Sequence, residues 1–106
     1  MIITTTPNIS GKEITNYLGV VTGETIFAIN AVRDFFASIR DIVGGRTNSY
    51  EEVLTKARTE ALNEMQHRAE ALGADAIVGV HISYESLGGN ATMLMVCCTG
   101  TAVKLA

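Results

Sequence analysis

A predicted β-strand near the end of the chain has two apolar sides, which few small folds can accommodate in a single copy. The segment MLMVCC, residues 93–98, has the composition of a strand, and successive strand side chains point to opposite faces of a sheet. The two rows are Met93, Met95 and Cys97 on one face and Leu94, Val96 and Cys98 on the other. Such a strand is typical of a sheet covered on both sides. Helices of the same chain can cover one side, and we expect a neighbouring subunit to cover the other.

The amino-acid composition also indicates that copies of the chain associate. Hydrophobic residues make up 47% of the 106 residues and charged residues only 18%, against about 25% in an ordinary soluble domain. The length fits a single domain, residues 1–106, with a core of modest size. Because this much apolar surface exceeds what one small core buries, we expect copies of the chain to associate with closed symmetry.

Charge and the absence of targeting signals narrow the possible partners. The net charge is −3 and the isoelectric point is about 5.2, so the chain lacks the basic surface that binds a phosphate backbone. No apolar run approaches the roughly 20 residues that cross a bilayer, and residues 1–10 do not resemble a signal peptide. Two adjacent cysteines are not a disulfide framework. We expect a soluble cytoplasmic protein without nucleic acid or membrane as partner.

The first half of the chain predicts two strands and a helix. A short strand around residues 2–6 should end at Pro7, and a second should span residues 13–24, bounded by Gly11 and Gly23. From Phe27 the apolar residues recur at steps of three and four, which predicts an amphipathic helix ending at Gly44 and Gly45. The apolar stripe of this helix is Ile29, Val32, Phe35, Phe36, Ile39 and Val43.

A second helix is predicted to begin at the capping box Ser49-Tyr-Glu-Glu52 and to end at Gly73. Its apolar stripe is Tyr50, Val53, Leu54, Ala57, Ala61, Met65 and Leu72. Two strands follow, residues 75–84 and 93–105, joined by a loop with Gly88-Gly89-Asn90 at its turn. The order β-β-α-α-β-β predicts an α+β fold, with two helices packed on one face of a largely antiparallel sheet.

The sulfur atoms near the end of the chain are the candidate metal ligands. Cys97 and Cys98 cannot both approach one ion from a regular strand, because neighbouring side chains point to opposite faces. Met93, Met95 and Cys97 share a face and are soft ligands of the kind that select Cu(I). Core packing is the simpler explanation, since buried free cysteine and methionine are common core residues. A ring could nevertheless bring one Cys97 from each subunit to a common axis.

His81 is the second kind of candidate ligand, and its position depends on the register of the last two strands. If paired residue numbers add to an even value, His81 shares a face with Met95 and Cys97; if they add to an odd value, it does not. The loop between the strands allows both registers. His67 lies among charged residues of the second predicted helix and is most simply a solvated residue.

The sequence contains few candidate catalytic residues. A Cys–His pair of His81 with Cys97 or Cys98 is conceivable, but a reactive thiolate needs an electropositive, partly exposed setting that MLMVCC does not offer. Gly44-Gly45-Arg46 before a helix could bind an anion through backbone N–H groups. A glycine-terminated helix followed by a tight loop explains the same residues.

Four segments follow one another across nearly the whole chain: GVVTGETI, RDFFASIRDIVGGRTNSYEEVL, ALGADAIVGV and MLMVCCTGTAVK. In this order they resemble the YbjQ family of small bacterial proteins, which is catalogued under heavy-metal binding. The resemblance implies an α+β subunit that assembles into a closed ring, a homopentamer or a stacked pair of pentamers. It also suggests the residues of the ring contacts, which are Phe35, Phe36, Ile42, Met93 and Met95.

Three hypotheses follow, in order of preference. The first is a non-enzymatic homo-oligomer that binds a ligand at its subunit interfaces. The second is a soft-metal-binding protein that uses Cys97 with Met95 or His81, Cys98 being the remaining thiol. The third is an enzyme of unknown type, for which no set of nucleophile, base and orienting residue can be assembled.

Overall fold

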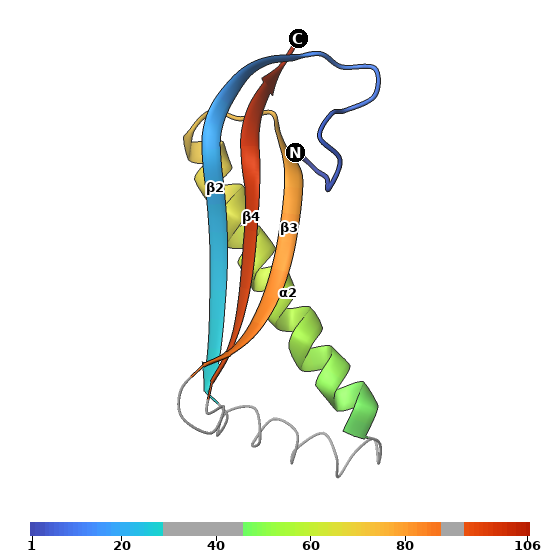
Figure 1. Cartoon of the computed structure of the whole chain (residues 1–106), viewed down its shortest axis with the longest axis vertical. Coiled ribbons are helices and arrows are strands. Elements are labelled where there is room, and N and C mark those ends of the chain that lie inside the picture. The colour runs from blue at the N-terminus through green and yellow to red at the C-terminus, as the bar shows by residue number, and fades with distance from the viewer. Residues whose placement is uncertain (29–45, 88–92) are drawn as a thin grey trace.

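A computed structural model describes residues 1–28, 46–87 and 93–106, in which one helix packs on one face of a long, twisted sheet (Figure 1). The strands are β1 (Ile2–Ile3), β2 (Ile14–Ala28), β3 (Ala76–Leu87) and β4 (Met93–Leu105). The helix, α2, spans Arg46–Ala71 and lies behind the sheet in the view of Figure 1. These parts of the chain confirm an α+β fold.

The four strands form one mixed sheet in the order β1-β3-β4-β2. β4 lies in the middle and pairs in antiparallel fashion with both β2 and β3, while the short β1 pairs in parallel with the start of β3. Because β4 has a strand on either side, it lies in the middle of the sheet, where apolar side chains on both of its faces are expected. Its predicted bounds, residues 93–105, are confirmed.

The predicted order of elements and number of helices need correction. The described residues contain one helix on the sheet instead of two, and the predicted first helix falls almost wholly on residues 29–45, outside the described part. Its predicted start at Phe27 was wrong, because Phe27 and Ala28 continue strand β2. The predicted end of this strand at Glu24 was also wrong, because β2 runs on to Ala28.

Helix α2 also differs from its predicted bounds at one end. It begins at Arg46, three residues before the predicted start at Ser49. Its end is as expected for a glycine stop: Gly73 has a φ of +80°, in the left-handed region, and its N–H donates to the Glu70 carbonyl at 2.9 Å. Leu72, predicted to belong to the apolar stripe, is 49% exposed.

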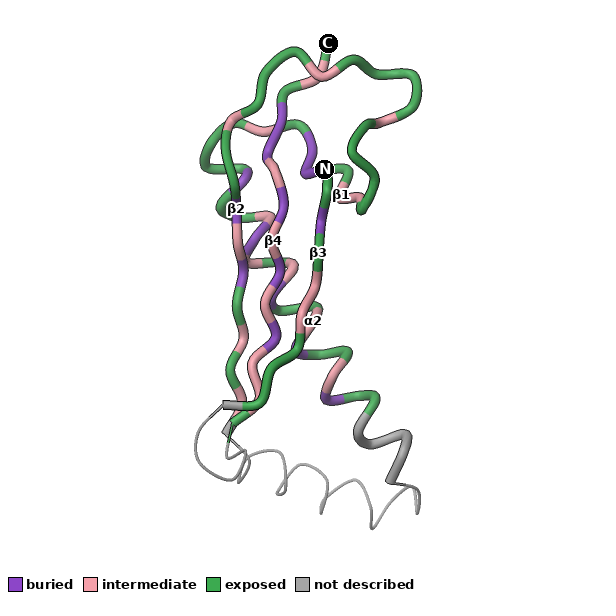
Figure 2. The backbone as a smooth tube through the Cα atoms, viewed as in Figure 1, coloured by how far each residue is buried: buried purple, intermediate pink, exposed green. Residues whose placement is uncertain are grey.

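The main core lies between α2 and the sheet (Figure 2). The helix buries a row of mostly small residues spaced four apart: Val53, Ala57, Ala61, Met65 and Ala69. This row lets the helix approach β2 closely at Gly23, where an added Cβ would lie 2.0 Å from the Ala61 carbonyl oxygen. The sheet supplies the other half of this core through Val21, Ile77, Val80, Val96, Cys98 and Ala102.

A smaller core lies on the opposite side of the sheet, at the end where both termini lie in Figure 1. Ala76, Val78 and Val103 are buried there, and the N-terminal segment covers them with Ile9 and Ile14. The remainder of this side of the sheet is not covered by α2 or by the N-terminal segment.

Candidate functional site

The side of the sheet opposite α2 carries the residues that the sequence singled out. We call it the open face, and its members are Val20, Thr22, Glu24, Ile26, His81, Ser83, Glu85, Met93, Met95, Cys97, Thr99 and Thr101. Strand alternation assigns them to this side, because their neighbours along each strand belong to the core under α2. Val20 is 75% exposed and Ile26 is 56% exposed. The open face is therefore a partly apolar surface that the described residues leave accessible.

The register of β3 and β4 decides where His81 points. His81 pairs with Thr99 and Ser83 pairs with Cys97, so paired numbers add to an even value. Of the two registers that the sequence allowed, this is the one that places His81 on the same face as Met95 and Cys97. His81 is then diagonal to Cys97, with Cβ atoms about 7 Å apart in such an arrangement.

The two cysteines have different environments. Cys97 is half-buried on the open face, whereas the Cys98 side chain is fully buried in the core under α2. Burial raises the pKa of the Cys98 thiol, and the neighbouring Cys97 raises it further. Cys98 is therefore held as a neutral thiol away from the other candidate ligands, while the Cys97 sulfur faces the same side as Met95 and His81.

Sequence reasoning missed Glu24, which lies next to Cys97, and its ion-pair partner Arg68. Glu24 on β2 pairs directly with Cys97, and its Oε2 atom lies 3.5 Å from Arg68 Nη1. The same Nη1 donates to the Thr22 carbonyl at 2.9 Å, so Arg68 reaches from α2 around the outer edge of β2. The spacing of Glu64 and Arg68 predicts their ion pair on the helix, but nothing local in the sequence predicts the contact with β2.

The described residues of one chain do not by themselves surround a metal ion. In the part of the chain that the structure describes, no group of three or more His, Cys, Asp or Glu side chains is arranged to hold one. Cys97 with His81, or Cys97 with Met95, supplies two soft or borderline donors from one chain. Among the described residues these two donors form no larger group of ligands, so an ion held here would need further donors such as water or a neighbouring copy.

The other predicted residues lie apart from this group. His67 is exposed on α2, as expected for a solvated residue. Met93 is 38% exposed at the far end of the open face. The predicted contact residues Phe35, Phe36 and Ile42 lie outside the described residues.

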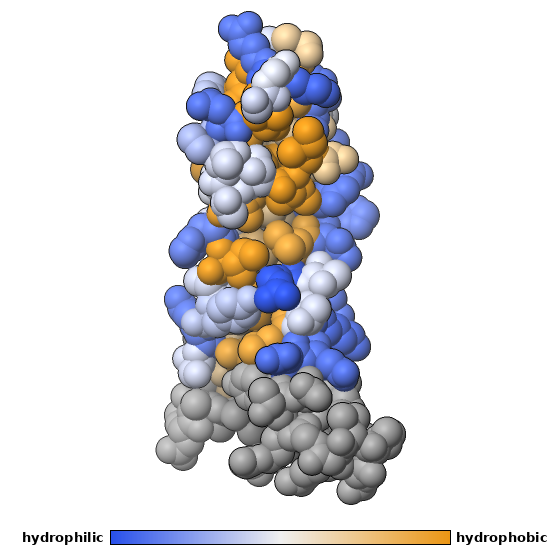
Figure 3. Space-filling model, turned by 90° about the vertical axis from the view of Figure 1, so that its right-hand side faces the viewer, coloured by the Kyte–Doolittle hydropathy of each residue, from blue (hydrophilic) through white to orange (hydrophobic). Residues whose placement is uncertain are grey.

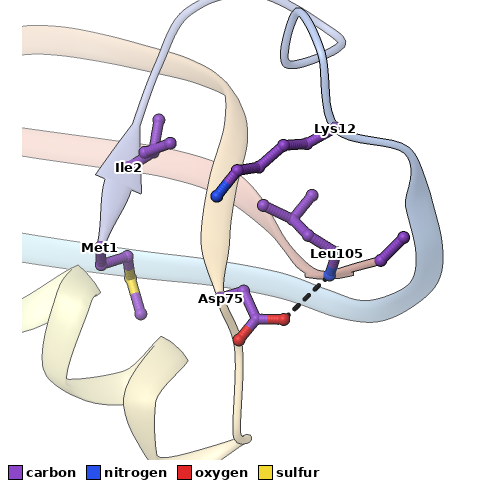
Figure 4. A pocket seen from close by; sticks show the side chains of 6 residues that line it. Met1, Ile2, Lys12, Asp75 and Leu105 are labelled. Atoms are coloured by element: carbon purple, nitrogen blue, oxygen red, sulfur yellow. Dashed lines mark hydrogen bonds between the residues drawn. The ribbon is translucent and has the colours of Figure 1, made fainter.

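A shallow depression of about 450 Å³ lies at the other end of the molecule, lined by Met1, Ile2, Lys12, Asp75, Leu105 and Ala106 (Figure 4). Asp75 Oδ2 accepts a hydrogen bond from the Leu105 N–H at 2.9 Å. This bond, more than the nearby Lys104 and Lys12, lowers the pKa of the Asp75 carboxyl. Because the carboxylate is already used to hold the end of β4, we assign the depression a structural role.

An apolar strip marks another side of the molecule. Figure 3 shows apolar residues in a broken vertical strip, flanked by hydrophilic ones, on the side where β3 lies. Helix α2 packs mainly on β2 and β4, so Ile82 is only partly buried and Tyr84 is 44% exposed. The strip and the open face are two distinct accessible surfaces with apolar content.

The whole chain matches a family of known sequences. A sequence model of the YbjQ family, described as "Putative heavy-metal-binding", matches residues 1–106. The chain belongs to the YbjQ family. This confirms the resemblance of the four segments to that family.

A solved structure supports the fold independently. The crystal structure at 2.73 Å resolution of a protein of unknown function from Pediococcus pentosaceus ATCC 25745, a DUF74 family member, is similar with a TM-score of 0.59. The two sequences are 20% identical, and the match covers 100% of this chain and 98% of that chain. The likeness therefore extends over the whole fold. Within the described residues, no helix is long and apolar enough to span a membrane.

Proposed function

We propose that this chain is a non-enzymatic subunit of a homo-oligomeric ring that binds a ligand at its subunit interfaces. The observation that carries the proposal is the open face, where a central strand with two apolar sides has only one side covered by α2. A neighbouring copy that covers the open face would bury Val20, Ile26, Met93 and Met95.

The energetics favour such a contact. Burying an exposed aliphatic side chain contributes about 1.5–3 kcal/mol. Several such side chains on one face, each already partly buried, contribute a part of this amount toward the loss of translational and rotational freedom on association, which costs about 4–15 kcal/mol. A ring uses two different surfaces of each subunit, and the chain offers the open face and the apolar strip along β3. The family resemblance makes five the expected number of subunits.

Sedimentation velocity of paired charge variants tests this proposal. Ile26→Glu places a charge on the open face, while Thr59→Glu places the same charge on the exposed side of α2. Because Ile26 is exposed in the single chain, neither change should prevent folding. We expect Ile26→Glu to sediment as a monomer and Thr59→Glu to sediment as the wild-type oligomer. Equal behaviour of the two variants would contradict the open face as the interface.

Soft-metal binding is the second candidate function, and the register of β3 and β4 favours it. The register places the Cys97 thiol, the His81 imidazole and the Met95 thioether on one accessible face. Thiolate and thioether select Cu(I) and related soft ions, and imidazole suits zinc and copper. These residues therefore fit the class of ligand described for the family, with Cys97 as the shared donor.

Elemental analysis of untagged protein separates the two thiols. Cys97→Ser should lose bound metal, and Cys98→Ser, its neighbour on the buried face, should keep it. The same low metal content in the wild type and in both variants would eliminate this candidate and leave the oligomer proposal intact.

A further inference from the structure

We propose that the β-bulge at Gly79 and Val80 is a positioning device that turns His81 onto the open face beside Cys97, where both side chains ligate one thiophilic divalent cation. This inference rests on the soft-metal function proposed above. It goes further by naming the nitrogen donor and the backbone feature that presents it.

The bulge can be read from the pairing of β3 with β4. Before it, Ala76 pairs with Val103 and Val78 with Thr101; after it, His81 pairs with Thr99. The strand thus gains one residue relative to its partner between Val78 and His81. Because side chains alternate with a period of two, one extra residue moves every later side chain to the other face.

Burial confirms this change of face independently of the pairing. Ile77, an odd-numbered residue, belongs to the core under α2, whereas Val80 and Ile82, even-numbered residues, belong to that same core. In an unbroken strand His81 would lie on the face of Ile77, beneath the helix. The bulge instead places its imidazole on the exposed side.

The backbone around the bulge fits this role. Gly79 has a φ of +62°, a conformation that favours glycine. Its N–H donates to the Thr6 carbonyl at 2.9 Å, and the Val80 N–H donates to the Thr4 carbonyl at 3.1 Å. Across the bulge, Gly100 has no room for a side chain, since an added Cβ would lie 2.6 Å from Ile77 Cγ2. The bulge is therefore fixed by contacts on both sides.

Cys97 has one direct neighbour on each flanking strand of the open face, Glu24 on β2 and Ser83 on β3. Ser83, a small residue, pairs directly with Cys97, and His81 lies on the diagonal. Cβ atoms about 7 Å apart suit a cation held at about 2.3 Å from sulfur and about 2.0 Å from nitrogen. On binding, the Cys97 thiol releases its proton to solvent and the thiolate forms the metal–sulfur bond. Water or a neighbouring copy would fill the remaining coordination positions.

Titration of the purified full-length chain with Cd²⁺ tests the proposal. The readouts are equilibrium dialysis and the ultraviolet thiolate-to-cadmium charge-transfer band. We expect His81→Ser to weaken Cd²⁺ binding by at least about tenfold, because even the loss of a residue that only supports a ligand has an effect of this size. Cys98→Ser should bind Cd²⁺ as the wild type does.

Moving the imidazole tests the face on which it must lie. The double variant His81→Ser, Ser83→His returns an imidazole to the open face, directly across from Cys97, and should recover Cd²⁺ affinity. The matched control His81→Ser, Tyr84→His places it on the other face and should not recover affinity. Recovery in both, or in neither, would overturn the proposal.

The bulge itself is tested by deleting Gly79. If the shortened chain folds, His81 turns toward the helix and Cd²⁺ affinity should fall to that of His81→Ser; wild-type affinity would overturn the positioning role. If the chain does not fold, the imidazole-transfer variants decide the question. Loss of binding in Cys97→Ser but not in His81→Ser would reject this inference alone, while no binding by the wild type would reject the soft-metal function too.

Discussion

Gly23 allows the backbone of α2 to lie directly on strand β2. Its Cβ position is 2.0 Å from the Ala61 carbonyl oxygen and 2.8 Å from the Met65 nitrogen, and both are backbone atoms that no side-chain rotation can move. The whole helix must therefore shift to admit one methyl group.

We expect Gly23→Ala to destabilise the fold by about 1–3 kcal/mol or more, as overpacking of a tight core does. Urea denaturation followed by circular dichroism measures the change. The exposed substitution Thr59→Ala is the control and should stay within about 0.5 kcal/mol of the wild type. A neutral Gly23→Ala would show that the helix does not pack this closely on β2.

Asp75 couples stability to acid pH. Its pKa is lowered in the folded chain, first by the hydrogen bond from the Leu105 N–H and then by Lys104 and Lys12. A lowered folded-state pKa means that the stabilisation is complete above the unfolded-state pKa and is lost as the pH falls through the folded-state value.

The urea midpoint of the wild type should therefore fall between about pH 4 and pH 2 by more than that of Asp75→Asn. Lys104→Gln, which leaves the bond from Leu105 in place, should reduce this difference only in part. Parallel acid profiles of the wild type and Asp75→Asn would contradict the role of this carboxylate.

Among the elements, β4 could be predicted from the sequence and β2 and β3 only in part. A run with two apolar sides is long and unambiguous, which is why the bounds of β4 were right. Strand β2 continues to Ala28 because the helix covers its buried side well beyond Gly23, and a glycine that permits this contact looks like a strand end in the sequence alone.

The candidate site could be predicted only in part, because the alternation of side chains along a strand does not reveal a β-bulge. Cys97 was assigned to the correct row from the pattern of β4, but the face of His81 depends on the bulge. Gly79 was the available signal, since an isolated glycine inside a strand often marks a bulge. Arg68 and Glu24 were missed because their contact joins residues far apart in the chain.

Arg68 contacts the outer edge of β2 at Thr22 and Glu24. The Arg68 guanidinium donates a hydrogen bond to the Thr22 carbonyl and forms ion pairs with Glu24 and Glu64. Unprotected strand edges promote pairing between chains, and a charged side chain on the edge is a common way to prevent it.

Arg68→Ala should therefore lose only about 1 kcal/mol of stability, since these ion pairs are exposed, yet aggregate faster than the wild type. Static light scattering on incubation measures aggregation, with Lys56→Ala, an exposed change on the same helix, as the control. Unchanged aggregation in Arg68→Ala would show that this edge needs no protection.

For the whole molecule, the proposed assembly predicts how the two thiols respond to alkylation. Cys98 is buried within the chain, so iodoacetamide should modify it slowly in every variant. Cys97 should be protected in the wild-type oligomer and become reactive in Ile26→Glu, where the open face is exposed. Mass spectrometry of a time course gives both rates, and equal Cys97 rates in the two proteins would place the interface elsewhere.

The molar mass of the untagged wild type across a dilution series, measured by light scattering on a sizing column, tests the central claim most directly. Another copy of the chain should cover the apolar side of the sheet that residues 1–28, 46–87 and 93–106 leave uncovered. We predict a constant multiple of 11.3 kDa at micromolar concentration, five-fold for a single ring and ten-fold for a stacked pair. A mass of 11.3 kDa at every concentration would contradict the account.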